Sequence, residues 1–409
     1  MIILNKFLFF LVLPACLLIS SCSPISTPAS ELLPTISLSP SPTITPTNPT
    51  SSINNSNLTN LSISCIEVSD IIPIGITLKN SLVLSSLSDE SYILNLETNN
   101  KIYLGEYLSE EMSVSPDLQK LAYRDLEAEK LIVKDVDGTE LKSFDGFDDR
   151  FHSIKWLDNE NLAINKAKEE QPLYYHYSLV IFNILTSSFK EFNVDDFPNG
   201  DKYGVGYPNL YPNPQLTEMV YSIPEDSSPI VLFDMQTGSQ LRKIYFSEWA
   251  PEWVHDGTKF IVSATLKFDK YSNFVDNLPY LGGNEIFLVK NTGEINRLTF
   301  LTTKYKESHY SALSWSPTEE YIAFDLINSS EPDFGLSVLD VNTGEITNYC
   351  IDDNWGYIYW SPDGKQIAFT RGNGFEPLKS KAYILDLEKK LAFKIADNVS
   401  VKGWMINTP

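Results

Sequence analysis

The sequence predicts an all-β protein, specifically a seven-bladed β-propeller built from four-stranded antiparallel blades. A motif of two consecutive strand hairpins recurs along the chain at roughly 40 to 50 residues, the period of propeller repeats. The strands alternate apolar and polar residues and flank short Asp-Gly or Asn-Thr-Gly turns. The outer hairpin of the motif occurs seven times. We therefore expect seven blades, with six or eight as alternatives.

The inner hairpin of each repeat begins with one large residue and continues through a tight turn. The clearest copy runs from Trp360 through Ser-Pro-Asp-Gly to Phe369. Pro presets φ, Asp accepts hydrogen bonds from the backbone and Gly adopts positive φ, so this tetrapeptide suits a turn. We expect the first residue of each copy to wedge between adjacent blades. In chain order these residues are Val114, Trp156, Tyr211, Trp253, Trp315 and Trp360.

The two ends of the repeat region are incomplete in complementary ways. Residues 81–85 resemble the second strand of a first blade, but the segment before them lacks the inner-strand pattern. Residues 401–406, which include Trp404, resemble an inner strand with nothing after it. A C-terminal strand that completes the first blade would close the ring and remove both exposed edges.

The repeat resembles the TolB-type, WD40-like propeller repeat. The copy that starts at Trp360 and the outer hairpin of residues 285–298 carry this resemblance, which extends over residues 75–406. That repeat occurs in periplasmic TolB, in tricorn-like proteases and in prolyl-oligopeptidase propellers. The resemblance implies a propeller fold. It implies no particular activity, because the matching residues shape turns and packing.

The N-terminus has the pattern of an export signal. Lys6 precedes an apolar run over residues 7–19 that is too short to span a bilayer. The run ends in Ile-Ser-Ser-Cys22, which resembles the bacterial lipobox. Residues 1–21 are therefore expected to be a lipoprotein signal peptide, and Cys22 to be acylated and to bind membrane lipid. A simple secretory signal or an uncleaved anchor is the alternative.

A tether is expected to follow the lipidation site. Residues 22–62 are rich in Ser, Thr and Pro and show no hydrophobic period. Such a segment buries too little apolar surface to offset its ordering entropy, and frequent Pro keeps it extended. We expect a disordered tether that joins the lipid to a propeller domain over residues 63–409. The protein would lie in the cell envelope as a membrane-anchored lipoprotein facing the periplasm or the cell exterior.

The net charge limits the classes of partner, and the number of cysteines limits the possible disulfides. The chain has 53 Asp and Glu against 31 Lys and Arg, a net charge of −22, so we expect no nucleic-acid partner. Beyond Cys22 only Cys65 and Cys350 remain, and outside the cytoplasm two cysteines can pair. A disulfide would pin the incoming chain to the late blades. Two free buried thiols are the alternative.

The longer repeats carry their extra length in connections that should share one rim. These connections join strands two and three of a blade, or one blade to the next, while short turns occupy the opposite rim. Loops held by a rigid scaffold often bind ligands, and aromatic residues with nearby acids suit peptides, sugars or cationic groups. Aromatics that form small cores within their own loops are the alternative. The connections are 165–177, 195–208, 265–284 and 301–312. The candidate binding residues are Tyr174, Tyr175, His176, Tyr177, Tyr203, Tyr207, Phe268, Tyr271, Phe274, Tyr280, His309 and Tyr310.

No catalytic signature occurs in the sequence. Gly-x-Ser-x-Gly, His-Glu-x-x-His and Cys-x-x-Cys are all missing. We therefore expect a non-enzymatic binding or scaffold module for protein, peptide or glycan, without cofactor or metal. A metal-dependent lyase or hydrolase that uses His176 and His309 at the channel mouth is the first alternative. A purely structural part of an envelope complex is the second.

Overall fold

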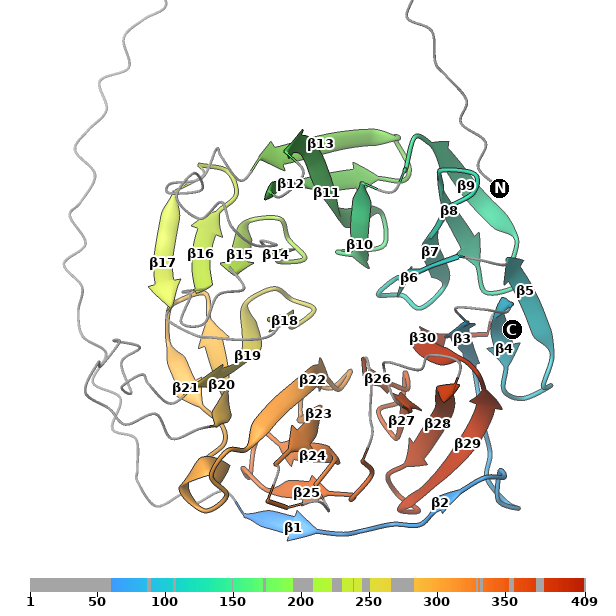
Figure 1. Ribbon diagram of the computed structural model, residues 1–409, viewed down its shortest axis with the longest axis vertical. Coiled ribbons are helices and arrows are strands. Elements are labelled where there is room, and N and C mark those ends of the chain that lie inside the picture. Colours follow the sequence, from blue (N-terminus) through green and yellow to red (C-terminus); the bar gives the residue numbers. More distant parts are fainter. Residues whose placement is uncertain are drawn as a thin grey trace, which may run out of the picture. The chain divides into compact units, whose positions relative to one another are not determined.

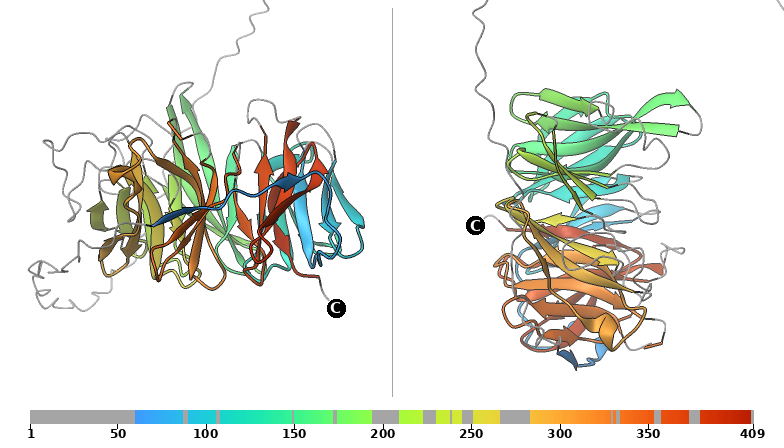
Figure 2. Two further views of the ribbon diagram at one scale, coloured as in Figure 1. Left: turned by 90° about the horizontal axis from the view of Figure 1, so that it is seen from below. Right: turned by 90° about the vertical axis from the view of Figure 1, so that its left-hand side faces the viewer.

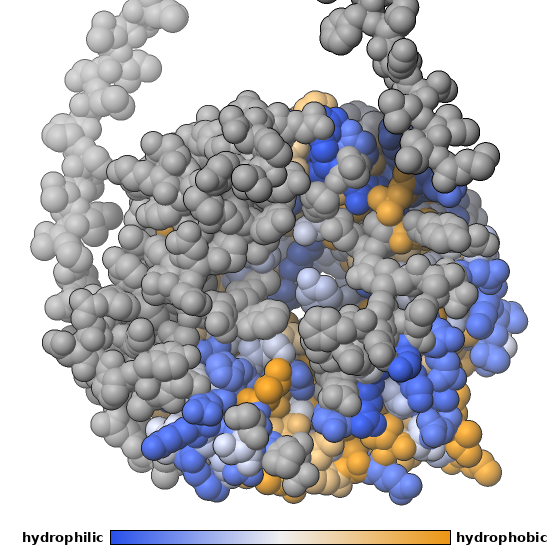
Figure 3. All heavy atoms as spheres, in the orientation of Figure 1, coloured by the Kyte–Doolittle hydropathy of each residue, from blue (hydrophilic) through white to orange (hydrophobic). Residues whose placement is uncertain are grey.

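Seven β-sheets are arranged as the blades of a propeller around a common centre in the computed structural model (Figure 1). The fold is therefore all-β and seven-bladed, as the repeat pattern predicts. Seen with all its atoms, this part of the chain is hollowed at the centre (Figure 3). The structure describes residues 60–86, 90–105, 108–148, 150–171, 174–193, 209–222, 230–237, 239–244, 251–265, 283–328, 330–331, 334–352, 357–372 and 379–407.

Blades 2 to 5 are each one continuous antiparallel meander whose first strand lies innermost (Figure 1). Blade 2 comprises β6 (Leu108–Val114), β7 (Lys120–Asp125), β8 (Lys130–Asp135) and β9 (Glu140–Asp145). Blade 3 comprises β10 (Phe151–Trp156), β11 (Asn161–Gln171), β12 (Tyr174–Asn183) and β13 (Ser188–Asn193). Blade 4 comprises β14 (Asn209–Pro212), β15 (Glu218–Ser222), β16 (Ile230–Asp234) and β17 (Gln240–Ile244). Blade 5 comprises β18 (Glu252–Trp253), β19 (Lys259–Thr265), β20 (Asn284–Lys290) and β21 (Ile295–Arg297).

Blade 1 joins the two ends of the repeat region. The C-terminal strand β30 (Ser400–Met405) pairs antiparallel with β3 (Ser81–Ser85), and the sheet continues through β4 (Ser91–Asn95) and β5 (Lys101–Gly105). Trp404 lies opposite Leu82 in this pairing. The expected closure of the ring by the C-terminal strand is therefore confirmed, and β3 is paired on both of its edges.

Blades 6 and 7 each carry a fifth strand from the beginning of the described chain. Blade 6 comprises β22 (His309–Trp315), β23 (Tyr321–Ile327), β24 (Leu336–Asp340) and β25 (Ile346–Asn348). Blade 7 comprises β26 (Tyr359–Trp360), β27 (Gln366–Arg371), β28 (Lys381–Asp386) and β29 (Leu391–Asp397). The parallel additions are β1 (Leu61–Ile63) on β25 and β2 (Val68–Ser69) on β29. We call residues 60–69 the strap, since they run along the outside of both blades (Figure 1). It begins slightly before residue 63, where the propeller domain was expected to start.

The large first residues of the inner hairpins do wedge between blades, as expected. Four of them, and Trp404 on the C-terminal strand β30, are tryptophans whose indole Nε1 donates a hydrogen bond to a backbone carbonyl of the preceding blade. The bonds run from Trp156 to Ser113 (2.9 Å), Trp253 to Tyr211 (3.0 Å), Trp315 to Glu252 (3.3 Å), Trp360 to Ser314 (3.1 Å) and Trp404 to Tyr359 (3.0 Å). Each wedge thus combines apolar burial with a satisfied polar group.

One blade junction is packed differently because two small residues meet there. Val114 stands at the wedge position of blade 2, and Gly403 faces it from β30. A Cβ on Gly403, whose φ is +150°, would lie 2.7 Å from the Val114 Cγ2 atom. The last strand therefore needs glycine at this position to approach blade 2 closely.

The inner turns are fastened by their own side chains. In blade 2 the Ser115 hydroxyl donates to the Asp117 carboxylate at 2.5 Å and accepts from the Lys120 N–H at 2.9 Å. Burial alone would raise the pKa of Asp117, but hydrogen bonds from Ser115, Lys120 and Gln119 lower it below 3.8. Ser361 and Asp363 repeat the hydroxyl–carboxylate bond in blade 7, at 2.7 Å.

The two rims of the ring differ in the length of their connections. On one rim, the short-turn rim, every connection between strands has four or five residues. On the other, the long-connection rim, connections range from residues 172–173 in blade 3 to residues 266–283 in blade 5. The long β11 and β12 strands rise above their neighbours on the side away from the C-terminus (Figure 2). The extra length therefore lies on one rim, as the alternation of strand direction requires.

Candidate functional site

Part of the expected binding surface is a strand hairpin rather than a loop. Residues 165–177 were expected to form an irregular connection, but β11 continues to Gln171 and β12 begins at Tyr174. Their register pairs Lys168 with His176 and Ala167 with Tyr177. Aromatic residues favour a pleated surface, which explains why this segment extends the sheet. Tyr174, Tyr175, His176 and Tyr177 therefore lie on the projecting part of β12.

Half of the candidate binding residues lie outside the described residues. They come from the connections between blades 3 and 4 and between β19 and β20. They are Tyr203, Tyr207, Phe268, Tyr271, Phe274 and Tyr280. Their assignment to the long-connection rim rests on the positions at which the flanking strands end and begin.

His309 and Tyr310, at the start of β22, are separated by the alternation of the strand. His309 is partly exposed, whereas Tyr310 is completely buried. The Tyr310 hydroxyl lies 3.0 Å from the Glu285 carboxylate. Burial raises the pKa of Tyr310, and the nearby Glu285 carboxylate raises it further. Tyr310 is thus a core residue, and its expected place on the exposed binding surface is wrong.

Glu285 organises the connection between blades 5 and 6. Its completely buried carboxylate accepts from the Thr302 N–H at 2.9 Å, from the Thr302 hydroxyl at 2.5 Å and from the Leu301 N–H at 3.3 Å. The Thr299 hydroxyl also donates to it, and Arg297 pairs with it at 2.8 Å. Hydrogen bonds and a cation satisfy this buried charge. They fix the short 3₁₀ helix η3 (Leu301–Thr303) on the long-connection rim.

Sequence reasoning missed Glu285. The residue looks like an ordinary polar position at the start of an outer strand. The available signal was the dense group of threonines in the Arg-Leu-Thr-Phe-Leu-Thr-Thr segment at 297–303. Such hydroxyl-rich segments can supply the donors that a buried carboxylate needs.

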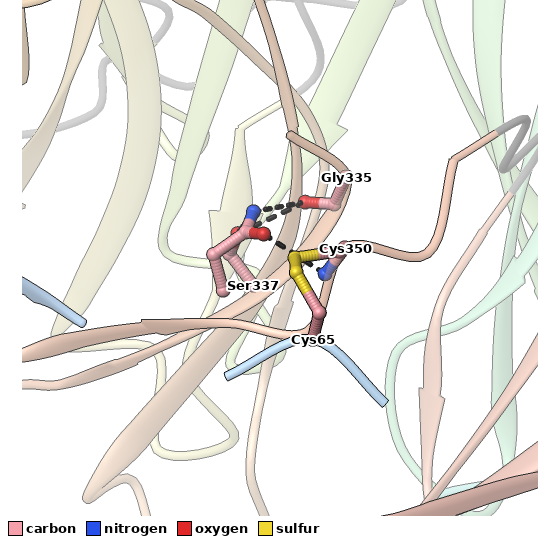
Figure 4. Close-up of a disulfide and its surroundings, with 5 residues drawn as sticks. Cys65, Gly335, Ser337 and Cys350 are labelled. Carbon is pink, nitrogen blue, oxygen red and sulfur yellow. Dashed lines mark hydrogen bonds between the residues drawn. A yellow bond between two sulfur atoms is a disulfide. The ribbon is translucent and has the colours of Figure 1, made fainter. Parts of the chain in front are cut away.

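A disulfide between Cys65 and Cys350 fastens the strap to blade 6 (Figure 4). Their Cα atoms are 4.8 Å apart and 285 positions apart in sequence. The Asn348 side chain supports this site, since it accepts from the Cys350 N–H at 2.9 Å and donates to the Ser337 hydroxyl at 2.8 Å. A Cβ on the adjacent Gly335 would lie 2.0 Å from the Ile351 carbonyl oxygen, so glycine is required there.

The described residues contain no cluster suited to a metal ion. No group of three or more His, Cys, Asp or Glu side chains is placed to coordinate one within the described ranges. His255 is exposed in the inner turn of blade 5. The side chain of His176 lies outside the described part of the chain. Within that part, no helix has the length and apolar character needed to cross a bilayer.

Comparisons with known proteins agree on the fold alone. No family model matches the chain, and no curated protein matches its sequence. A Pyrococcus horikoshii acylaminoacyl peptidase structure is similar with a TM-score of 0.53 and 14% identity, over 76% of this chain and 50% of that one. A second acylaminoacyl peptidase gives 0.53 and 13%, over 79% of this chain and 51% of that one. TolB from Acinetobacter baumannii gives 0.46 and 14%, over 79% and 82% of the two chains. The chain is a β-propeller similar in fold to the propellers of the two acylaminoacyl peptidases.

Proposed function

We propose that this protein is a membrane-tethered, extracytoplasmic binding module without catalytic activity. Its acyl anchor is Cys22, its tether runs from there to residue 59, where the strap begins, and its propeller presents the long-connection rim to a protein, peptide or glycan. The observation that carries the proposal is the asymmetry of the rims. Four- or five-residue turns occupy one rim, whereas the other has connections of very different lengths. A rigid ring with one variable rim is a common arrangement for recognition.

The Cys65–Cys350 disulfide supports the extracytoplasmic location. Disulfides persist in oxidising compartments and are rare in the cytosol. The strap also supports the tether, because it places the first described residues on the outside of blade 6, where β1 pairs with β25. A chain that enters there leaves the long-connection rim free for a ligand.

The first experiment tests the lipid anchor. Cells that express the full chain are fed a radiolabelled or clickable palmitate, and membrane and soluble fractions are separated. The wild type should incorporate label and sediment with membranes, whereas Cys22→Ser should do neither. Cys16→Ser is the matched control and should behave like the wild type. Equal labelling of the Cys22→Ser variant would contradict the anchor.

The second experiment tests the binding rim. The full-length protein, solubilised in detergent, is used for pulldown from envelope extracts and for a glycan array. Replacing residues 267–281 with a short Gly-Ser linker should abolish retention of the captured ligand. The same replacement of residues 373–378, which join β27 to β28 in blade 7, is the control and should leave retention unchanged. A ligand that still binds after the first replacement would overturn the rim assignment.

A further inference from the structure

The wall of the central channel carries an ion pair that joins two non-adjacent blades. Lys155 on β10 of blade 3 pairs with Glu252 on β18 of blade 5 at 3.1 Å. Both strands are innermost in their blades, so the pair passes the inner edge of blade 4 at the channel (Figure 1). Their side chains are 52% and 36% exposed, and a solute in the channel can reach both.

Three tyrosines lie on, or two residues before, the innermost strands of blades 4 and 7. Tyr359 lies on β26 of blade 7, and Tyr357 precedes it with its ring centroid 6.3 Å away. Tyr211 lies on β14 of blade 4, at a wedge position where five other blades have tryptophan. Tyr357, two residues before the innermost strand of blade 7, is 68% exposed.

Tyr211 and Tyr359 share the Glu252 carboxylate as an electrostatic neighbour. Burial raises the pKa of Tyr211, and Tyr357 and Glu252 raise it further. Burial likewise raises the pKa of Tyr359, with the same two groups adding to the effect. Glu252 thus acts on tyrosines of blade 4 and blade 7, and the strands that carry these three residues are all innermost in their blades. The phenols of Tyr211 and Tyr359 remain protonated at physiological pH and can donate and accept hydrogen bonds.

The net charge of this set selects among ligand classes. The charges of the Lys155 ammonium and the Glu252 carboxylate cancel, and Tyr211 and Tyr359, whose pKa values are raised, are neutral. A charged ligand would have to separate the pair and leave one member without its partner, which costs free energy in a partly desolvated channel. A neutral polyol accepts from the Lys155 ammonium and donates to the Glu252 carboxylate while the pair stays intact. The exposed Tyr357 ring offers an apolar face to the C–H side of a pyranose.

We propose that the central channel is a binding site for a neutral oligosaccharide, held by the Lys155–Glu252 pair and the Tyr357 ring. The proposal extends the binding function inferred above to a second place and names its ligand class. It does not depend on residues 266–283, so the two sites can fail independently.

The test is isothermal titration calorimetry on the full-length, detergent-solubilised protein. The probes are maltohexaose, cellohexaose, mannohexaose and chitohexaose, with hexagalacturonate and hexalysine as charged competitors. At least one neutral hexasaccharide should bind with a Kd below about 1 mM. Tyr357→Ala, Lys155→Met and Glu252→Gln should each weaken that binding about tenfold or more.

Two matched variants control for general effects. Tyr103→Ala removes another exposed tyrosine, 50% exposed on the outer strand β5, and Lys365→Met breaks an exposed ion pair with Glu388. Both should leave the affinity unchanged, and circular dichroism melts should show that all variants fold. No binding of any neutral probe, tighter binding of a charged one, or full affinity in Tyr357→Ala would each overturn the proposal. If channel variants weaken binding while the 267–281 replacement does not, the channel proposal stands and the rim assignment fails.

Discussion

Blades 6, 7 and 1 differ from blades 3, 4 and 5 in what holds them together. In the first group, the closed side, tryptophan wedges join both internal junctions, the strap adds strands to two blades, and a disulfide anchors it. In the second group, the variable side, Tyr211 stands at one wedge and an exposed ion pair links blades 3 and 5. The variable side also carries the longest connections.

This difference indicates that the two sides of the ring have different roles, although both are built from the same repeat. The closed side joins the chain ends, and its contacts are backbone pairings, buried indoles and a covalent bond. The variable side keeps the same strands but replaces part of the packing with polar and aromatic groups that face the channel or the long-connection rim. Stability should therefore respond most to substitutions on the closed side, and recognition to substitutions on the variable side and at Tyr357, which blade 7 contributes to the channel.

The largest expected effect is the loss of the disulfide on the closed side. Replacing both Cys65 and Cys350 with Ser should reduce the free energy of unfolding by about 2–4 kcal/mol, because the link closes a very long loop in the unfolded chain. Urea denaturation of the oxidised wild type and the double variant measures the difference. An unchanged midpoint would show that the strap is held by β1 and β2 alone.

The second-largest expected effect is the loss of stability when a wedge residue is substituted, and it should differ between the two sides. Trp360→Phe removes the bond to the Ser314 carbonyl and leaves a small cavity, so it should cost about 1–3 kcal/mol. Tyr211→Phe removes only a hydroxyl and should cost less than about 1 kcal/mol. Thermal and urea denaturation of both variants provide the comparison. Equal losses would mean that the two junctions do not differ in the way described.

The pH dependence of the inner turn of blade 2, which lies between the two sides, gives a smaller effect. The pKa of Asp117 is lowered in the folded protein, so its stabilising contribution is complete above the unfolded value of 3.8. That contribution is lost as the pH falls through the folded pKa. The wild type should therefore be more stable than Asp117→Asn at pH 6, and the gap should shrink below about pH 4. Urea midpoints across pH 2.5 to 7 test this, and a gap that widens on acidification would contradict it.

The smallest expected effect on stability is at the channel. Lys155→Met breaks an ion pair that solvent reaches, so it should change the free energy of unfolding by less than about 0.5 kcal/mol. The same variant should weaken oligosaccharide binding strongly. Denaturation and calorimetry on one preparation measure both quantities. A large loss of stability would make the pair a structural clamp rather than part of a binding site.

The periodic features of the sequence predicted the fold well. Turn residues around Asp363, the wedge residue Trp360 and the unpaired strand near Trp404 recur in register, and they gave the blade number and the closure. The strap was not predicted as strands, because residues 61–69 form only short pairings that depend on β25 and β29 being present.

The candidate site was less predictable, since its contacts have no period. Tyr310 appeared to be a rim residue, because its burial depends on Glu285, which belongs to the preceding blade. The channel set was missed because Lys155, Glu252 and Tyr357 come from different repeats, and only the closed ring brings them together. Single-repeat patterns contain no information about such contacts.

Hydrogen exchange of the full-length protein, followed by mass spectrometry with the disulfide intact and then reduced, tests the distinction between the two sides most directly. With the disulfide intact, amides in β1, β2 and β30 should exchange slowly, as the inner strands of blades 6 and 7 do. On reduction, protection should fall in the strap and the outer strands β25 and β29, while blades 3 to 5 stay unchanged. Faster exchange in blades 3 to 5, or an unaffected strap, would contradict the account.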